Sequence, residues 1–101
     1  MKQIRVIWSS EALEDLETIY DFLAESSQQA AQNVSERILL RVRQIEDFPQ
    51  SGVLHRSLKG NNREYRYLVE GNYKIIYSLI PKYAVIAAIF DTRKDPEKLQ
   101  V

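Results

Sequence analysis

The stretch REYRYLVEGNYKIIYSL, from Arg63 to Leu79, decides the fold of this chain. Two runs in which apolar residues alternate with polar ones flank the pair Gly71-Asn72, which is typical of a tight reversal. The stretch therefore predicts two antiparallel strands. It also holds four tyrosines and three basic residues. Such a mixture occurs on nucleic-acid-binding surfaces and in half-buried sheets, so the direction of each side chain has to decide between the two interpretations.

The alternation of side chains along a strand assigns each residue of the stretch to a face. The tyrosine-rich face matches the pattern of a surface packed on helices, where a phenol needs only one polar partner. This face comprises Tyr65, Tyr67, Val69, Tyr73, Ile75, Tyr77 and Leu79. The opposite face comprises Arg66, Leu68, Lys74, Ile76 and Ser78. We therefore expect the tyrosines in the core and the basic residues on an open face.

The residues on either side predict the other elements. Alternating apolar residues indicate a first strand over 2–8, and Ser9-Ser10 then supplies a cap for a helix from Glu11 to about Glu25. A capping box of Ser26 and Gln29 starts a second helix, which runs to Asp47. Residues 50–62 are predicted as a loop, strands follow at 64–69, 73–79 and 83–90, and the tail 91–101 has no clear period. The order β-α-α-β-β-β predicts an α+β fold, an antiparallel sheet with a two-helix hairpin on one face.

Composition narrows the class of protein. With 101 residues the chain is predicted to form a single domain, and 45% hydrophobic with 28% charged residues is typical of a globular protein. There is no cysteine and only one histidine, His55, which we interpret as a solvated loop residue. These counts argue against a disulfide framework or a zinc site, and we expect no cofactor and no metal. The N-terminal apolar patch is interrupted by Arg5 and too short for a signal peptide or membrane span, so we expect a cytoplasmic protein without a membrane partner.

The neutral net charge conceals an asymmetry. Residues 1–54 hold five Lys or Arg against nine Asp or Glu, a balance of −4, whereas residues 55–101 hold nine against five, a balance of +4. Basic residues of the second half are predicted to gather around the open sheet face, where they suit an anionic partner. The candidates for this target- or phosphate-facing set are Arg56, Lys59, Arg63, Arg66, Lys74, Arg93 and Lys94. Parity alone is equally compatible with separate surface cations.

A set of motifs spread over residues 4–99 resembles the RelE/ParE superfamily of bacterial toxins, the toxin halves of type II toxin–antitoxin modules often called plasmid stabilisation proteins. The motifs are Trp8 with Ala12 and Leu16–Ile19, Phe48-Pro49-x-x-Gly52, REYRYL, NYKIIYSL and the closing FDTRKDP. The superfamily has two activities on one fold. RelE-like members cleave mRNA on the ribosome, and ParE-like members bind DNA gyrase and trap its cleaved complex.

The resemblance also separates these activities residue by residue. Positions that carry a cation in the RelE pattern are kept as Arg66, Lys74 and Arg93, the catalytic candidates if the chain is a ribonuclease. The pattern's second lysine falls at Leu68 and its tail tyrosine near Leu99, neither of which can transfer a proton. The histidine that related nucleases use would fall near Asp91 or Thr92, and neither residue is a histidine. We therefore favour a ParE-like gyrase inhibitor without a catalytic residue over a ribosome-dependent endoribonuclease.

The resemblance implies a cognate antitoxin as a partner, besides DNA gyrase or, in the alternative, the ribosome and mRNA. An apolar part of the open sheet face is the predicted antitoxin-facing surface, comprising Leu68, Ile76 and Ile86. A third hypothesis is a non-toxic relative that keeps the antitoxin-binding fold alone.

Overall fold

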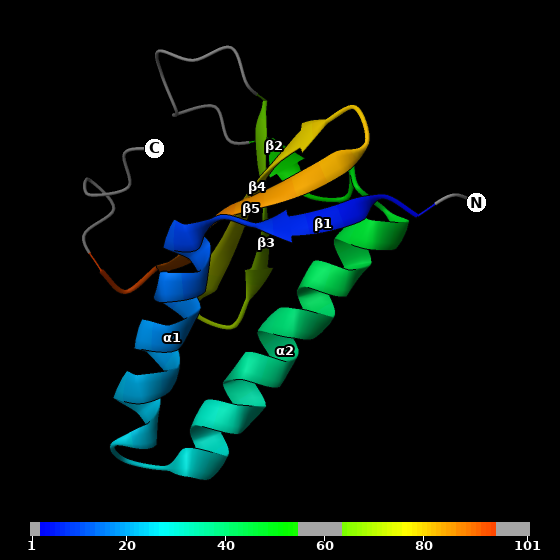
Figure 1. Cartoon of the computed structure of the whole chain (residues 1–101). Coiled ribbons are helices and arrows are strands. Elements are labelled where there is room, and N and C mark those ends of the chain that lie inside the picture. The colour runs from blue at the N-terminus through cyan, green and yellow to red at the C-terminus, as the bar shows by residue number, and fades with distance from the viewer. Residues whose placement is uncertain (1–2, 55–63, 95–101) are drawn as a thin grey trace.

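The hairpin of two helices packs against one face of a five-stranded sheet in the computed structural model, which describes residues 3–54 and 64–94 (Figure 1). The elements are β1 (Arg5–Trp8), α1 (Ser10–Ala24), α2 (Gln28–Asp47), β2 (Val53–Leu54), β3 (Tyr65–Glu70), β4 (Tyr73–Ile80) and β5 (Tyr83–Asp91). The predicted α+β architecture is confirmed. None of the helices in the described ranges is long and apolar enough to cross a membrane.

The sheet is mixed, whereas the sequence predicted a wholly antiparallel one. Its strand order is β1-β5-β4-β3-β2, and β1 pairs with β5 in parallel. The helical hairpin returns the chain to the start of β1, where the Ile4 N–H donates to the Glu46 carbonyl over 3.1 Å. The short β2, which lies in the predicted loop 50–62, forms the edge of the sheet farthest from β1. From there β3, β4 and β5 pair antiparallel in succession, and β5 lies beside β1.

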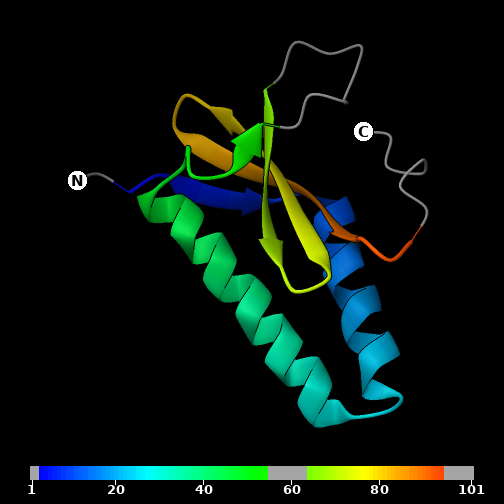
Figure 2. The same ribbon diagram turned by 180° about the vertical axis from the view of Figure 1, so that it is seen from behind.

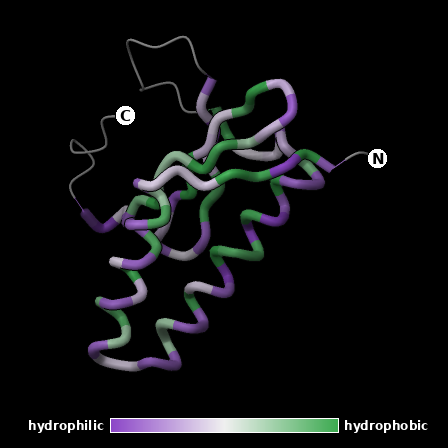
Figure 3. The backbone as a smooth tube through the Cα atoms, in the orientation of Figure 1, coloured by the Kyte–Doolittle hydropathy of each residue, from purple (hydrophilic) through white to green (hydrophobic). Residues whose placement is uncertain are grey.

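Local sequence signals set the ends of the helices. Ser9 caps α1, its hydroxyl accepting from the Ala12 N–H at 3.0 Å. The predicted capping box is wrong by one residue, because Ser27 rather than Ser26 caps α2 and accepts from the Ala30 N–H at 3.1 Å. Polar and apolar residues alternate around both helices, which leaves each with one apolar side for the sheet (Figure 3).

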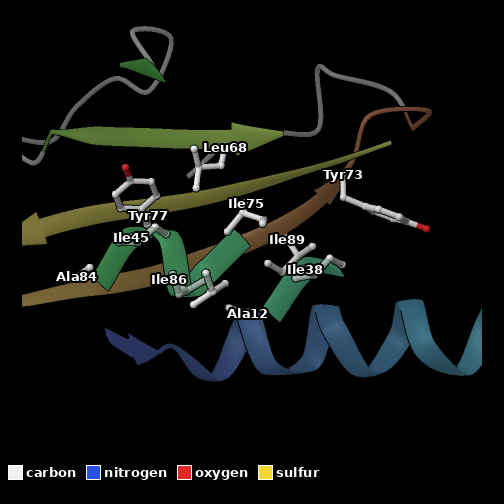
Figure 4. Close-up of a cluster of buried hydrophobic side chains, with 11 residues drawn as sticks. Ala12, Ile38, Ile45, Leu68, Tyr73, Ile75, Tyr77, Ala84, Ile86 and Ile89 are labelled. Carbon is white, nitrogen blue, oxygen red and sulfur yellow. The ribbon is translucent and has the colours of Figure 1, made fainter. Parts of the chain in front are cut away.

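The core lies between this apolar side and one face of the sheet (Figure 4). Its buried cluster comprises Ala12, Ile38, Val42, Ile45, Leu68, Tyr73, Ile75, Tyr77, Ala84, Ile86 and Ile89. The predicted faces of β4 are therefore confirmed, since Tyr73, Ile75 and Tyr77 all point to the helices.

The predicted faces of β3 are wrong. Directly opposed residues of an antiparallel pair lie on the same face, and β3 opposes Leu68 to Ile75 and Arg66 to Tyr77. Leu68 and Arg66 therefore point to the helices. Tyr65 and Tyr67, opposed to Ser78 and Ile76, point to the helix-free face. The inversion follows from the two-residue turn Gly71-Asn72, which opposes Glu70 to Tyr73 and thereby fixes the register.

Candidate functional site

The structure describes four of the seven cations singled out from the sequence, and these four do not lie together. Arg56, Lys59 and Arg63 lie outside the described residues, as do His55 and Leu99. The other four are Arg66, Lys74, Arg93 and Lys94.

Arg66 holds the segment that follows α2. Its Nη1 donates to the carbonyls of Gly52 at 2.9 Å and Gln50 at 3.2 Å, and its Nη2 pairs with the Glu64 carboxylate at 3.1 Å. The side chain is only 16% exposed. The largely buried guanidinium is thus occupied by two backbone carbonyls and a carboxylate, so it belongs to the fold rather than to an open binding face.

Tyr77 of β4 holds the same segment that follows α2. Its hydroxyl donates to the Pro49 carbonyl at 2.7 Å and accepts from the Gly52 N–H at 2.9 Å. A Cβ atom on Gly52 would lie 2.6 Å from that hydroxyl and 2.9 Å from the Tyr67 carbonyl, so only glycine fits there. Burial raises the pKa of the Tyr77 phenol. The Pro-x-x-Gly motif is thus a structural joint between the end of α2 and the sheet.

Lys74 lies on the other, helix-free face of the sheet. Its Nζ is 4.4 Å from the centroid of the Tyr67 ring, and its strand neighbours on that face are Val69 and Phe90. The ammonium therefore makes a cation–π contact with the tyrosine that the sequence had placed in the core.

Arg93 follows the end of β5 and pairs with Asp91. Its Nε and Nη2 donate to the two carboxylate oxygens at 3.0 and 2.9 Å, and Nη2 also lies 3.4 Å from the Tyr73 hydroxyl. The hydrogen bond from Arg93 holds the pKa of Asp91 below its ordinary value. Thr92 donates from its backbone N–H and its hydroxyl to the Asn72 carbonyl, which ties this end of β5 to the β3–β4 turn. Lys94 is exposed beside it.

The three ribonuclease candidates do not form one site. Arg66 and Lys74 point to opposite faces of the sheet. Arg66 lies opposite Tyr77 while Arg93 contacts Tyr73, and those tyrosines are separated by four strand positions, roughly 13 Å at the rise of a β-strand. One scissile phosphate cannot contact all three cations in this arrangement.

The predicted antitoxin-facing residues are not on an open surface. Leu68 and Ile86 belong to the buried cluster under the helices, with 8% and 0% exposure. Ile76 does lie on the helix-free face, opposed to Tyr67, and is also fully buried. Leu68 was placed on the wrong face because the faces of β3 were inverted. Ile86 was placed on the wrong face because the register between β4 and β5 shifts between Ile76 and Tyr77, so that Ile86 lies opposite the core residue Tyr77.

The comparisons with known proteins place this arrangement in a family. Residues 6–96 match the family model described as "ParE toxin of type II toxin-antitoxin system, parDE". The chain belongs to the ParE toxin family. A solved structure titled "Chromosomal ParDE TA system from P. aeruginosa" has the same fold, with a TM-score of 0.69 and 18% identity over 88% of this chain and 96% of that one. A search of curated protein sequences gives no significant match.

Four large apolar side chains are exposed on the helical hairpin of this ParE-family chain, and others are exposed on the strands and connections of the described residues. Leu13, Phe22, Leu39 and Leu40 are 44–66% exposed. Leu13 and Leu39 each lie 13 positions from Ser26 along antiparallel helices, so both are roughly 20 Å from the connection and level with one another. These exposed leucines are therefore candidates for a docking surface.

The sequence analysis did not single out Asp15 of α1, which holds the edge of the sheet. Its Oδ2 accepts from the Ile89 N–H at 3.0 Å. Because β1 ends at Trp8, the edge of β5 beyond it has no strand partner, and Asp15 takes the place of the next carbonyl. The only signal was its position one turn beyond Ala12, at the margin of the apolar stripe.

Proposed function

We propose that this ParE-family chain inhibits growth by binding DNA gyrase and poisoning it, and that a cognate antitoxin neutralises it. The observation that carries the proposal is the placement of Leu68 and Arg66. The RelE pattern puts phosphate-handling cations at both positions, whereas here Leu68 is a core residue and Arg66 is bound to two backbone carbonyls.

Cleavage of RNA by its own 2′-OH needs a base, a cationic group at the phosphate and an acid for the leaving oxygen, all within hydrogen-bonding distance of one another. The described residues give no such set, because the remaining cations lie on opposite faces or at the far end of a strand. A binding poison needs only a folded surface, so this arrangement favours the gyrase mechanism.

The two partners would use different parts of the molecule. We assign the antitoxin to the hairpin leucines Leu13, Leu39 and Leu40, because an amphipathic segment buries its apolar side on such a surface. The target would meet the polar end of β5, where Lys94 is exposed. The cations at 56, 59 and 63 remain candidates for the same surface.

The deciding experiment tests the purified, folded chain in parallel on DNA supercoiling by gyrase and on translation in a cell extract. We expect supercoiling to be inhibited, with accumulation of cleaved DNA, and translation to continue. Arrested translation with normal supercoiling would establish the ribonuclease alternative instead. Absence of both effects would identify a non-toxic antitoxin-binding relative.

A further inference from the structure

A cavity of about 200 Å³ lies where the β3–β4 turn meets the helical hairpin. In both Figure 1 and Figure 2 this turn lies between the two helices, whose connected ends project beyond the sheet. The walls include Leu23 of α1, Val34 and Arg37 of α2, Glu70 of β3, Tyr73 of β4, and Arg93. Residues from both helices and from the sheet therefore meet at this point, and Arg93 is the only one of them that the sequence analysis named as a binding candidate.

The cationic groups of this cavity retain free donors. Arg37 has no hydrogen-bond or ion-pair partner among residues 3–54 and 64–94. Arg93 uses Nε and Nη2 for Asp91 and Tyr73, so the Nη1 group is left for a ligand. Glu70 is offset by Arg41, whose Nε lies 3.4 Å from its carboxylate. The charge of Arg93 is likewise offset by Asp91, so among the described lining residues Arg37 is the cation without a counter-ion. Its charge lets the cavity accept an anion in spite of the acidic residue in the wall.

The lining also limits the kind of anion. Leu23, Val34 and the ring of Tyr73 form an apolar wall, and Tyr73 stands at the end of the buried cluster, pointing away from its other members (Figure 4). A glutamate or aspartate side chain has an apolar stem and a single charge, which match this wall and the two arginines. A phosphate group has no apolar stem to contact this wall.

We propose that this cavity binds the side-chain carboxylate of an acidic peptide segment, held between Arg37 and the free Nη1 of Arg93. The volume accommodates one side chain, so the cavity is an anchor point within a larger interface. The inference rests on the proposed function in one respect, since the antitoxin is the partner expected to supply the segment.

The test follows the backbone amides of Gly71 and Asn72 and the Nε groups of the arginines by NMR, using the full ¹⁵N-labelled chain. The probes are a short capped peptide with one central glutamate among leucines and the same peptide with glutamine in its place. Charge-assisted hydrogen bonds of this kind change affinity by about tenfold or more, and we expect that preference for the glutamate peptide.

Arg37→Gln should remove the preference, and Arg37→Lys should retain part of it because the charge stays while the planar fork is lost. Arg43→Gln is the matched control, since Arg43 is an exposed arginine of the same helix that does not line the cavity. Unchanged thermal unfolding of each variant establishes that the fold is intact.

Equal binding of the two peptides, no binding of either, or an equal effect of Arg43→Gln would overturn the proposal. A single-stranded RNA oligonucleotide that shifts the same amides in an Arg37-dependent way, while the glutamate peptide does not, would also overturn it and would point to a phosphate site. The titration contains no gyrase, so it tests the cavity independently of the proposed function. Inhibition of supercoiling without a preference for the glutamate peptide would reject the cavity as an anchor point and leave the gyrase mechanism standing. A peptide preference without inhibition rejects the gyrase mechanism alone.

Discussion

At the scale of single residues, one hydroxyl joins three parts of the chain. The Tyr77 hydroxyl satisfies the Pro49 carbonyl and the Gly52 N–H, and both would be left without this partner in Tyr77→Phe. An unsatisfied buried polar group costs roughly 1–3 kcal/mol, so we expect the free energy of unfolding to fall by about 2 kcal/mol or more in urea titrations. Tyr83→Phe, at a half-buried position on β5, is the control and should change it by less than about 0.5 kcal/mol. Equal losses in the two variants would contradict the role given to the joint.

The pair of Asp91 and Arg93 predicts a dependence of stability on acid. The pKa of Asp91 is lower in the folded chain than its ordinary value, so the unfolded chain binds the proton first as pH falls. The pair's contribution is present above the ordinary aspartate pKa of about 4 and is lost as pH falls through the folded-state pKa. We expect the free energy of unfolding to decline less steeply below about pH 4 in Asp91→Asn, and also in Arg93→Gln, than in the unmodified chain. Parallel pH profiles for all three proteins would show that the pair does not contribute.

At the scale of elements, Asp15 fixes α1 to the edge of β5 beyond the end of β1. Asp15→Ala leaves the Ile89 N–H without its acceptor, so we expect a loss of about 1–2 kcal/mol in the free energy of unfolding. The Ile89 amide should also exchange its hydrogen faster, which a general weakening of α1 would not single out. Glu14→Ala, on the exposed side of the same helix, is the control for both measurements. Slower or unchanged exchange at Ile89 would refute the assigned contact.

The same scale explains what could be predicted from the sequence. The helices and long strands follow from periodicity and caps. The motifs that contain Gly52 and Tyr77 are part of the family resemblance, and in the structure they form the joint that pairs the Gly52 N–H and the Pro49 carbonyl. The faces of β3 were inverted because both of its faces alternate plausibly. Counting across the two-residue turn from Glu70 to Tyr73 would have given the register.

Other features depend on tertiary geometry that no periodicity contains. The parallel pairing of β1 and the two-residue β2 arise from where the hairpin returns the chain. The grouping of cations failed for the same reason, since sequence spacing places Arg66 and Lys74 near each other while the sheet separates them by its own thickness. The cavity with Arg37 brings together segments that no local pattern connects.

At the scale of the whole molecule, the roles of Arg66 and Lys74 separate the two mechanisms of growth inhibition. A ribonuclease site would lose activity with either residue while the protein stayed folded. Here Arg66 binds backbone carbonyls, so Arg66→Gln should lower the free energy of unfolding by about 1–3 kcal/mol and reduce toxicity only through loss of folded protein. Lys74→Gln removes one surface cation–π contact, so its loss should stay below about 1 kcal/mol.

The measurement pairs growth inhibition after induced expression with urea unfolding and with the amount of soluble protein in the same cells. We expect the toxicity of both variants to follow the amount of folded protein, because a binding surface elsewhere is unaffected by either change. Lowering the growth temperature should therefore restore the toxicity of Arg66→Gln, since more of a marginally stable chain is then folded. A fully folded Lys74→Gln or Arg66→Gln protein without toxicity would instead mean that these cations contact the target directly, and the placement of the active surface at the end of β5 would have to be abandoned.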